Sequence, residues 1–244
     1  MSLLKNSRLL STIILFISTL CLGSVVISIL GVRGGWLGTR TGFTTIAYAA
    51  QSGVAILIAT MIILYFSRGN ISSLIKSGLA LIFVLIPVVG HYTNQSEKQL
   101  PGPPINDIST DTTNPPSFNA VIPLRPAKST SIEYPGSKAA ARQKELFPDI
   151  APIESSLFPN QAFQRALDIS KAMNWDIVSQ NMRSGIIEAV ASTVVFNFKD
   201  DIVIRIQSTK LGSIIDIRSH SRIGRSDRGV NAARIIEFTE RFNQ

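Results

Sequence analysis

The amino-acid sequence predicts an α+β domain, with a mainly antiparallel sheet and two helices, behind an N-terminal region of three transmembrane helices. All 16 acidic residues of the 244-residue chain lie at or after Glu97, and the part before it consists of apolar runs separated by six basic residues. From about residue 147, short alternating segments lie between two segments with helical spacing. With 45% hydrophobic and 16% charged residues, the chain is too apolar for an ordinary soluble domain.

Three apolar runs predict membrane-spanning helices at about 9–30, 43–66 and 71–91, so residues 1–92 are expected to form a membrane region. A bilayer core requires roughly 20 apolar residues of helix, which the first two runs supply without a charge. The third reaches this length only with Lys76 extending to the interface. The first run exceeds the apolar core of a signal peptide, which favours an anchored helix. Three buried core helices are the alternative.

Basic residues near the spans predict a multi-pass protein of the cell (inner) membrane with a cytoplasmic N-terminus. Four basic residues would lie inside and three outside: Lys5, Arg8, Arg68 and Lys76, against Arg33, Arg40 and Lys98. Three spans then place the C-terminal domain outside the cytoplasm, in the periplasm if the cell has one. The lone Cys21 lies within the first span and can form no intrachain disulfide.

The net charge of +8 is a signal of membrane topology and not of nucleic-acid binding. Residues 93–244 contain 18 Lys and Arg residues and 16 Asp and Glu residues, so this part is nearly neutral. A nucleic-acid-binding domain would display a concentrated basic surface. The lipid bilayer is therefore the partner that the composition indicates, and no nucleic acid is expected.

Residues 93–146 form a proline-rich segment that is expected to be extended and to lie along the surface of the domain. The α+β domain itself is expected over residues 147–244, in the order β-α-β-β-β-β-α. Its predicted elements are a strand within 150–158, a helix at 160–173, strands at 175–179, 185–195, 202–206 and 215–221, and a helix from about residue 227. The buried stripe of the last helix is expected to be Asn231, Ile235, Phe238 and Phe242.

Several segments of this domain are similar, in the same order, to one bacterial family. They are Phe147–Ile150, Lys199–Asp201, Ser221–Asp227, Gly229–Ala232 and Arg234–Ile235. The chain thus resembles a membrane-anchored member of the family catalogued as domain of unknown function 1499, over about residues 99–242. In such members a histidine often stands at the position of Asn106, which argues against metal chemistry there. The resemblance implies a membrane-associated or envelope protein and no catalytic role.

The segment from Asp216 to Arg234 contains five arginines around a Gly-Arg-Ser-Asp turn that precedes a helix. Helix N-termini favour anions, and arginine forks suit phosphate and carboxylate groups. The residues of this candidate anion site are Arg222, Gly224, Arg225, Ser226, Asp227, Asn231 and Arg234. In the alternative interpretation, the arginines pair with Asp200, Asp201, Asp216 and Asp227 and hold strand ends against the helix. Asp227 at the helix start weighs against a phosphate.

The other polar residues predict neither a catalytic group nor a metal site, and no cofactor is expected. Asp200 and Asp201 are neighbours in a strand, so their side chains should point to opposite faces. Asp107 and Asp111 could hold a hard cation, but turn caps are the simpler interpretation. His220 is expected on the outer face of the last strand, and two separated histidines with the membrane-buried Cys21 supply no zinc set.

The leading functional hypothesis is a membrane-anchored envelope protein whose outer domain binds a partner or an anionic ligand. An envelope lipid headgroup, a cell-wall fragment or another envelope protein would fit such a location. The first alternative is a structural or scaffolding protein, in which the arginines only build the fold. The second is a hydrolase acting on envelope material, centred on Arg225, Asp227 and Asn231.

Overall fold

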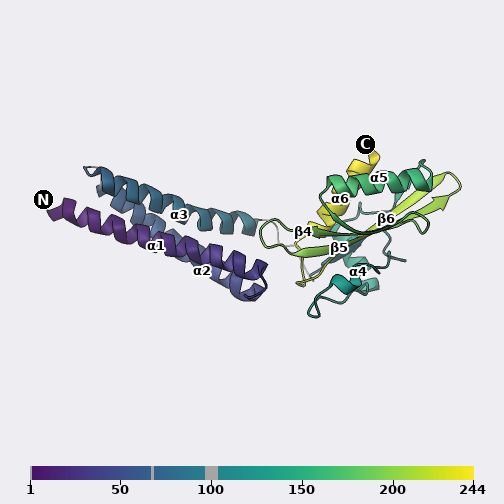
Figure 1. The fold of residues 1–244 in the computed structure, drawn as a ribbon, viewed down its shortest axis with the longest axis horizontal. Coiled ribbons are helices and arrows are strands. Elements are labelled where there is room, and N and C mark those ends of the chain that lie inside the picture. Colours follow the sequence, from purple (N-terminus) through teal and green to yellow (C-terminus); the bar gives the residue numbers. More distant parts are fainter. Residues whose placement is uncertain (1, 67–68, 97–103) are drawn as a thin grey trace. The chain divides into compact units, whose positions relative to one another are not determined.

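The computed structural model describes residues 2–66, 69–96 and 104–244. The chain forms two compact units, Met1–Lys98 and Gln99–Gln244. The first consists of helices and the second of a sheet with helices (Figure 1). The second unit thus begins well before residue 147 and includes residues 104–146 of the proline-rich segment.

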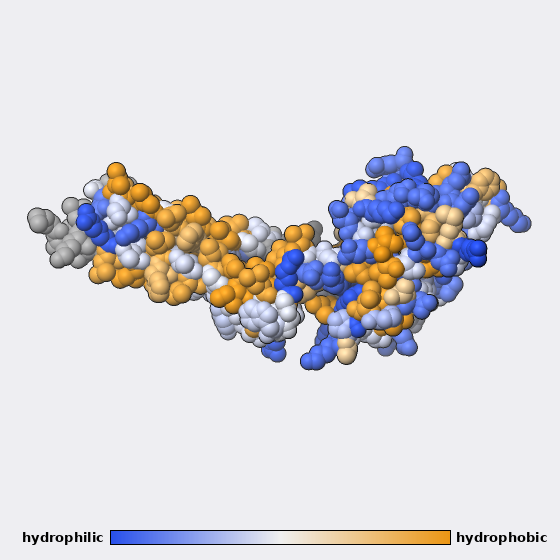
Figure 2. Space-filling view, in the orientation of Figure 1, coloured by the Kyte–Doolittle hydropathy of each residue, from blue (hydrophilic) through white to orange (hydrophobic). Residues whose placement is uncertain are grey.

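The helical unit contains α1 (Ser2–Arg33), α2 (Thr39–Phe66) and α3 (Ile71–Ser96), each of which contacts the other two. All three are long and apolar enough to cross a membrane, as the sequence predicts. Small residues lie where the helices meet: Gly53 faces Val84 and Val88, and such residues are typical of helix contacts in membranes. On the face seen in Figure 2, hydrophobic residues predominate on the surface of the helical unit, and hydrophilic residues predominate on the surface of the second unit.

The second unit is built on an antiparallel sheet of six strands, in the order β1-β6-β5-β4-β3, with β2 paired to β6 beside β1. Its strands are β1 (Asp107–Ser109), β2 (Ile153–Ser155), β3 (Asp176–Asn181), β4 (Ile186–Ser192), β5 (Lys199–Thr209) and β6 (Gly212–Ser221). Its helices are η1 (Ile122–Leu124), α4 (Ser137–Leu146), α5 (Pro159–Ala172) and α6 (Val230–Asn243). The α+β class is confirmed, and β2 to α6 follow the predicted order.

Helices α5 and α6 pack on one face of the sheet and enclose the main hydrophobic core (Figure 1). Isoleucines of β5 and β6 point into this core because every second residue of a strand faces the same side. All four residues of the predicted stripe on α6 are buried. The rings of Trp175 and Phe238 stack with centroids 5.7 Å apart.

The opposite face of the sheet is covered by residues 116–134. Phe118 and Val121 of this segment pack on Val190 of β4 and Val203 of β5. The Glu188 carboxylate fixes it further by accepting the backbone N–H groups of Asn119, Ala120 and Val121 at 2.9–3.1 Å.

The segment 104–146 is not extended throughout, and three elements in it were not predicted from the sequence. They are β1, η1 and α4. Residues 137–146 contain no proline and three consecutive alanines, which have the highest helix propensity, so helix formation prevails there. The domain therefore has three α-helices where the sequence predicts two.

Candidate functional site

Residues 222–229 connect β6 to α6, and we call this segment the arginine turn. Two glycines determine its backbone conformation. Gly224 and Gly229 have φ angles of 86° and 88°, which residues other than glycine rarely adopt. The Asp227 carboxylate accepts the backbone N–H groups of Gly229 at 3.0 Å and Asn231 at 2.7 Å. Burial raises the pKa of Asp227 despite these bonds. Asp227 thus fixes the turn against the first residues of α6.

Two arginines of the candidate anion site are engaged in ion pairs. Arg222 donates from Nε and Nη2 to Oδ1 of Asp201 at 2.9 and 2.7 Å, and Arg125 also pairs with this carboxylate. On the other face of the sheet, Arg234 pairs with Asp200 at 2.7 Å. Both guanidinium groups therefore tie β5 to the segments packed on it, as the structural interpretation predicts.

Asn231 is completely buried and links α6 to the sheet through side-chain hydrogen bonds. Its Nδ2 donates to the Asn106 carbonyl at 3.0 Å and to the Ser221 hydroxyl at 2.9 Å, and its Oδ1 accepts the hydroxyl of Ser219 at 2.6 Å. Arg225, in contrast, is exposed and forms no hydrogen bond or ion pair with any residue that the structure describes. It is the member of the predicted set whose charge remains available to a ligand.

The side chain of Asp107 lies in a buried ionic cluster and not in a turn. Arg218 donates to both of its carboxylate oxygens, at 2.9 and 2.7 Å. Burial favours the neutral acid, but the hydrogen bonds and charge of Arg218, together with His220, hold the pKa of Asp107 below its ordinary value. Asp111 is a turn cap as predicted, since it accepts the N–H groups of Thr113 and Asn114.

His220 is almost fully buried, with 2% of its surface exposed, because residues 116–134 cover the face that the sequence predicts to be outer. Its Nε2 lies 2.9 Å from the Thr130 hydroxyl, which itself donates to the Ser221 carbonyl at 2.7 Å. Nε2 is therefore assigned as the donor to Thr130. An imidazole that donates to a hydroxyl cannot act as its base, so this pair is not arranged as a nucleophile and a base.

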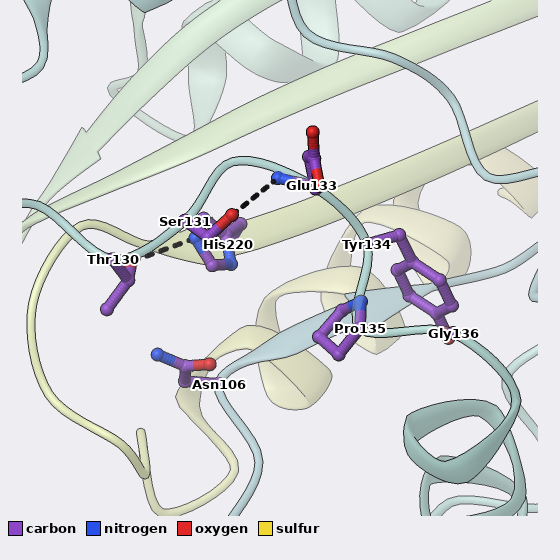
Figure 3. A pocket seen from close by; sticks show the side chains of 8 residues that line it. All are labelled: Asn106, Thr130, Ser131, Glu133, Tyr134, Pro135, Gly136 and His220. Atoms are coloured by element: carbon purple, nitrogen blue, oxygen red, sulfur yellow. Dashed lines mark hydrogen bonds between the residues drawn. The ribbon is translucent and has the colours of Figure 1, made fainter.

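Two neighbouring pockets open beside this cluster. The first, of about 400 Å³, is lined by Asn106, Thr130, Ser131, Glu133, Tyr134, Pro135, Gly136 and His220. The second, of about 300 Å³, is lined by Pro104, Ile105, Asn106, Asp107, Pro135, Lys138, Ala139 and Arg142. Figure 3 shows the first, with residues 130–136 along one side and Asn106 across from them. We call them the first and second pockets; they share Asn106 and Pro135.

The arginine turn adjoins the residues that line both pockets. The side chain of Asn106 donates to the Gly224 carbonyl at 2.6 Å, and the backbone N–H of Asp227 donates to the Ile105 carbonyl at 3.3 Å. The predicted site and the pockets thus form one continuous region of the domain.

Buried polar atoms without a hydrogen-bond partner gather at the two pockets. They are the hydroxyl of Tyr134, a lining residue of the first pocket, and Nε and Nη2 of Arg142, a lining residue of the second. His220 Nδ1 has no such bond either, but it lies 3.3 Å from Oδ2 of Asp107. Within residues 104–244 the remaining such atoms are Ser129 Oγ and Arg205 Nε. Burial, reinforced by the charge of Asp107, raises the pKa of Tyr134 to about 12, so this hydroxyl stays neutral.

Tyr134, Thr130 and Arg142 were not predicted from the sequence to line a site. A signal for Arg142 exists, because Lys138 and Arg142 are four residues apart and therefore lie on one face of α4. Tyr134 and Thr130 gave no such signal, since they lie in an irregular segment. Within the described ranges, no group of three or more His, Cys, Asp or Glu side chains could hold a metal ion.

Comparison with curated proteins gives no match for this chain. Comparison with protein families matches residues 107–242, more than half of the chain, to the family described as protein of unknown function DUF1499. The match begins at the first residue of β1 and ends in α6, so it covers the sheet, the ionic clusters and the arginine turn. The protein therefore belongs to the DUF1499 family and carries three helices able to span a membrane ahead of the family domain.

Proposed function

We propose that this protein is a membrane-anchored binding module whose family domain holds a polar or anionic ligand in the first and second pockets. The observation that carries the proposal is that Tyr134 and Arg142, which line these pockets, hold buried polar atoms without a hydrogen-bond partner. Each such atom costs about 1–3 kcal/mol when no partner compensates for its lost hydration. A ligand that supplies the missing partners would recover part of this energy on binding.

In this proposal the residues of the arginine turn have two roles. Arg225 contributes a free positive charge beside the pockets, and the exposed Gly224 and Ser226 leave its surroundings open. Arg222, Arg234, Asp227 and Asn231 position the turn through their bonds to the sheet and the helix. In the predicted anion site, Arg225 would therefore contact the ligand, and the other charged and polar residues would hold the turn in place.

The three apolar helices support a location in the cell envelope, with the domain on the outer side of the inner membrane. Lipid headgroups, cell-wall fragments and envelope proteins are then the accessible partners. The margin of four inner to three outer basic residues supports this orientation. An alkaline phosphatase reporter fused after Gln244 should be active, whereas an inactive but well-expressed fusion would reverse the orientation.

A structural role is the second candidate, and the buried ion pairs favour it. Arg218, Arg222 and Arg234 each bind an aspartate and join segments that are distant in the sequence. In this view the domain docks onto other envelope proteins and the pockets stay unused. The hydrolase hypothesis has less support, because Asp227 and Asn231 are both occupied by bonds that hold the backbone.

Filling the second pocket tests ligand binding against a structural role. Ala139 lines this pocket, whereas Ala141 is exposed on the same helix outside it, so Ala139→Trp and Ala141→Trp form a matched pair. Thermal unfolding of the full chain in detergent would be measured with added sugar phosphates, hydroxy acids and amino acids. We expect at least one class to raise the melting temperature of wild type and of Ala141→Trp, but not of Ala139→Trp. Stabilisation that is equal in both variants, or absent from wild type, would favour the structural role.

A further inference from the structure

The structure assigns an oxyanion subsite to the second pocket, where Arg142 and Lys138 of α4 hold a phosphate ester or carboxylate. This inference rests on the proposed function and specifies the chemistry of its ligand. It also moves the main anion contact away from the arginine turn, which the sequence singles out, to a helix that the sequence does not predict.

The guanidinium of Arg142 forms a hydrogen bond through Nη1 but none through Nε and Nη2. Its Nη1 donates to the Glu145 carboxylate at 2.6 Å, whereas Nε and Nη2 have no partner and are buried; 11% of the side chain is exposed. The N–H groups of Nε and Nη2 point in parallel from one edge of the planar group. Two oxygens of a phosphate or carboxylate fit that edge with two parallel bonds. Arg142 is one of the residues that line the second pocket, so this edge lies beside the space that a ligand would occupy.

The position of Arg142 is fixed by its neighbour Gln143, which is 1% exposed. The Gln143 side-chain amide accepts the backbone N–H of Ser109 at 2.9 Å and donates to the Ser109 carbonyl at 2.6 Å. These two bonds hold α4 against β1, so the Arg142 backbone is placed before any ligand arrives. Such preorganisation strengthens binding because less motion is lost on association.

The electrostatic balance of the second pocket favours a single anionic group. Asp107 also lines this pocket, but its charge is compensated by Arg218. Lys138 adds an exposed positive charge one helical turn from Arg142, and Glu145 is largely exposed to water, which weakens its effect. The uncompensated charge of the pocket is therefore positive.

The rest of the lining indicates what the oxyanion is attached to. Pro104, Ile105, Pro135 and Ala139 provide apolar contacts beside the charged groups, which favours an oxyanion carried on carbon over a free, fully hydrated ion. The shared residue Asn106 leads into the first pocket, where hydroxyl and carboxylate side chains could bind hydroxyl groups. A glycerol or sugar phosphate fits this sequence of environments.

The test uses the full chain in detergent, titrated with glycerol 3-phosphate and with acetate in a calorimeter. We expect wild type and Lys144→Gln to bind alike, because Lys144 is exposed on α4 and does not line the pocket. Arg142→Gln should weaken binding about tenfold or more, and Arg142→Lys should also weaken it, because an ammonium lacks the parallel donors. Lys138→Gln should weaken it about two- to fivefold, as expected for one exposed charge.

Equal binding by wild type and Arg142→Gln would overturn the inference, as would failure of wild type to bind either probe. If Arg142→Gln does not fold, Lys138→Gln replaces it in the test, because Lys138 is exposed. An unchanged affinity of Lys138→Gln for glycerol 3-phosphate would then overturn the inference. A neutral sugar that binds in an Ala139-dependent and Arg142-independent way would end the oxyanion assignment while leaving the proposed function intact. No binding of any probe class would end both.

The same protein in nanodiscs identifies the source of the oxyanion. Loss of glycerol 3-phosphate binding in phosphatidylglycerol nanodiscs, but not in phosphatidylcholine nanodiscs, would support a lipid headgroup. Unchanged binding in both would support a soluble phosphate ester. Arg142→Gln serves as the control in each membrane, and binding by this variant at wild-type affinity would again contradict the subsite.

Discussion

Arg218 binds Asp107 through two parallel hydrogen bonds, from Nε to Oδ1 at 2.9 Å and from Nη2 to Oδ2 at 2.7 Å. The guanidinium also lies 4.8 Å from the ring centroid of Phe118 and 5.3 Å from that of Tyr134. It donates further to the carbonyls of Pro116 and Ile132. One side chain thus joins β6, β1 and the segment that covers the second face of the sheet.

Breaking this pair should strongly destabilise the domain. Replacing Asp107 by alanine leaves the Arg218 charge buried without its counter-charge, which typically costs about 3–5 kcal/mol. Trp175 is buried in the main core, so its fluorescence reports urea unfolding in a Trp36→Phe background. Arg241→Met, which breaks the exposed Arg241–Glu237 pair, should change the free energy of unfolding by less than about 1 kcal/mol. A similar small loss in Asp107→Ala would show that the buried pair contributes little.

Acid should destabilise the domain through Asp107. Its pKa lies below the ordinary value of 3.8 in the folded state, so its contribution is complete above pH 3.8 and is lost as the pH falls through the lowered value. The free energy of unfolding should therefore decrease with decreasing pH in this range. Asp149→Asn, at an exposed position, should keep this dependence, and Asp107→Asn should flatten it.

Asp227 should contribute a dependence of the opposite sign. Burial raises its pKa above 3.8, so the folded state disfavours its charged form, and stability falls as the pH rises through the raised value. Asp227→Asn should remove this decline while losing one of the two hydrogen bonds that the carboxylate accepts, a cost of about 0.5–1.5 kcal/mol. Urea unfolding at a series of pH values separates the two effects, and an unchanged slope above pH 3.8 would contradict the assignment.

Arg225 and Arg222 should respond differently to alanine although they stand three residues apart. Arg225 is exposed and unpaired, so Arg225→Ala should change stability by less than about 0.5 kcal/mol. Arg222→Ala leaves Asp201 with one fewer partner in a buried site and should lower the melting temperature markedly. A large loss in Arg225→Ala would show that the arginine turn is structural throughout.

Gly212 should not tolerate alanine. A Cβ atom there would lie 2.1 Å from the Ser155 carbonyl oxygen, and the φ angle is 149°. Gly136 has φ and ψ angles of 81° and −159° but open space around it, so Gly136→Ala isolates the cost of backbone strain, about 1–3 kcal/mol. Gly212→Ala should exceed that cost, because β2 or the β5–β6 hairpin must move. Equal melting temperatures for the two variants would contradict the clash.

The parts of the fold that follow from periodic patterns could be predicted from the sequence. The apolar runs before Glu97 predict three spans, and the stripe from Asn231 to Phe242 predicts the buried side of α6. The face of the sheet on which His220 lies was predicted, but its burial was not, because alternation tells which residues share a face but not whether another segment covers it. The same limit concealed β1, which is three residues long and held by the side chain of Gln143.

The candidate site was only partly accessible to sequence reasoning. Asp200 and Asp201 point to opposite faces and bind Arg234 and Arg222, as the strand geometry requires. Whether an arginine of the turn is paired depends on contacts with residues more than 20 positions away in the sequence. The local spacing of residues carries no such information. Anion binding at Arg225 stays a prediction. The pockets arise where the proline-rich segment folds back beside Asn106, and no periodic signal predicts such packing.

The paired bonds between Gln143 and Ser109 have a consequence for solubility. β1 is the last strand of its sheet, and a terminal strand presents unpaired N–H and C=O groups that can recruit another chain. The Gln143 amide occupies the N–H and the C=O of Ser109, as an adjacent strand would. One side chain thereby blocks edge-to-edge polymerisation at this point. That protection matters for a domain joined to helices able to span a membrane, because copies confined to one membrane plane meet more often than copies free in solution.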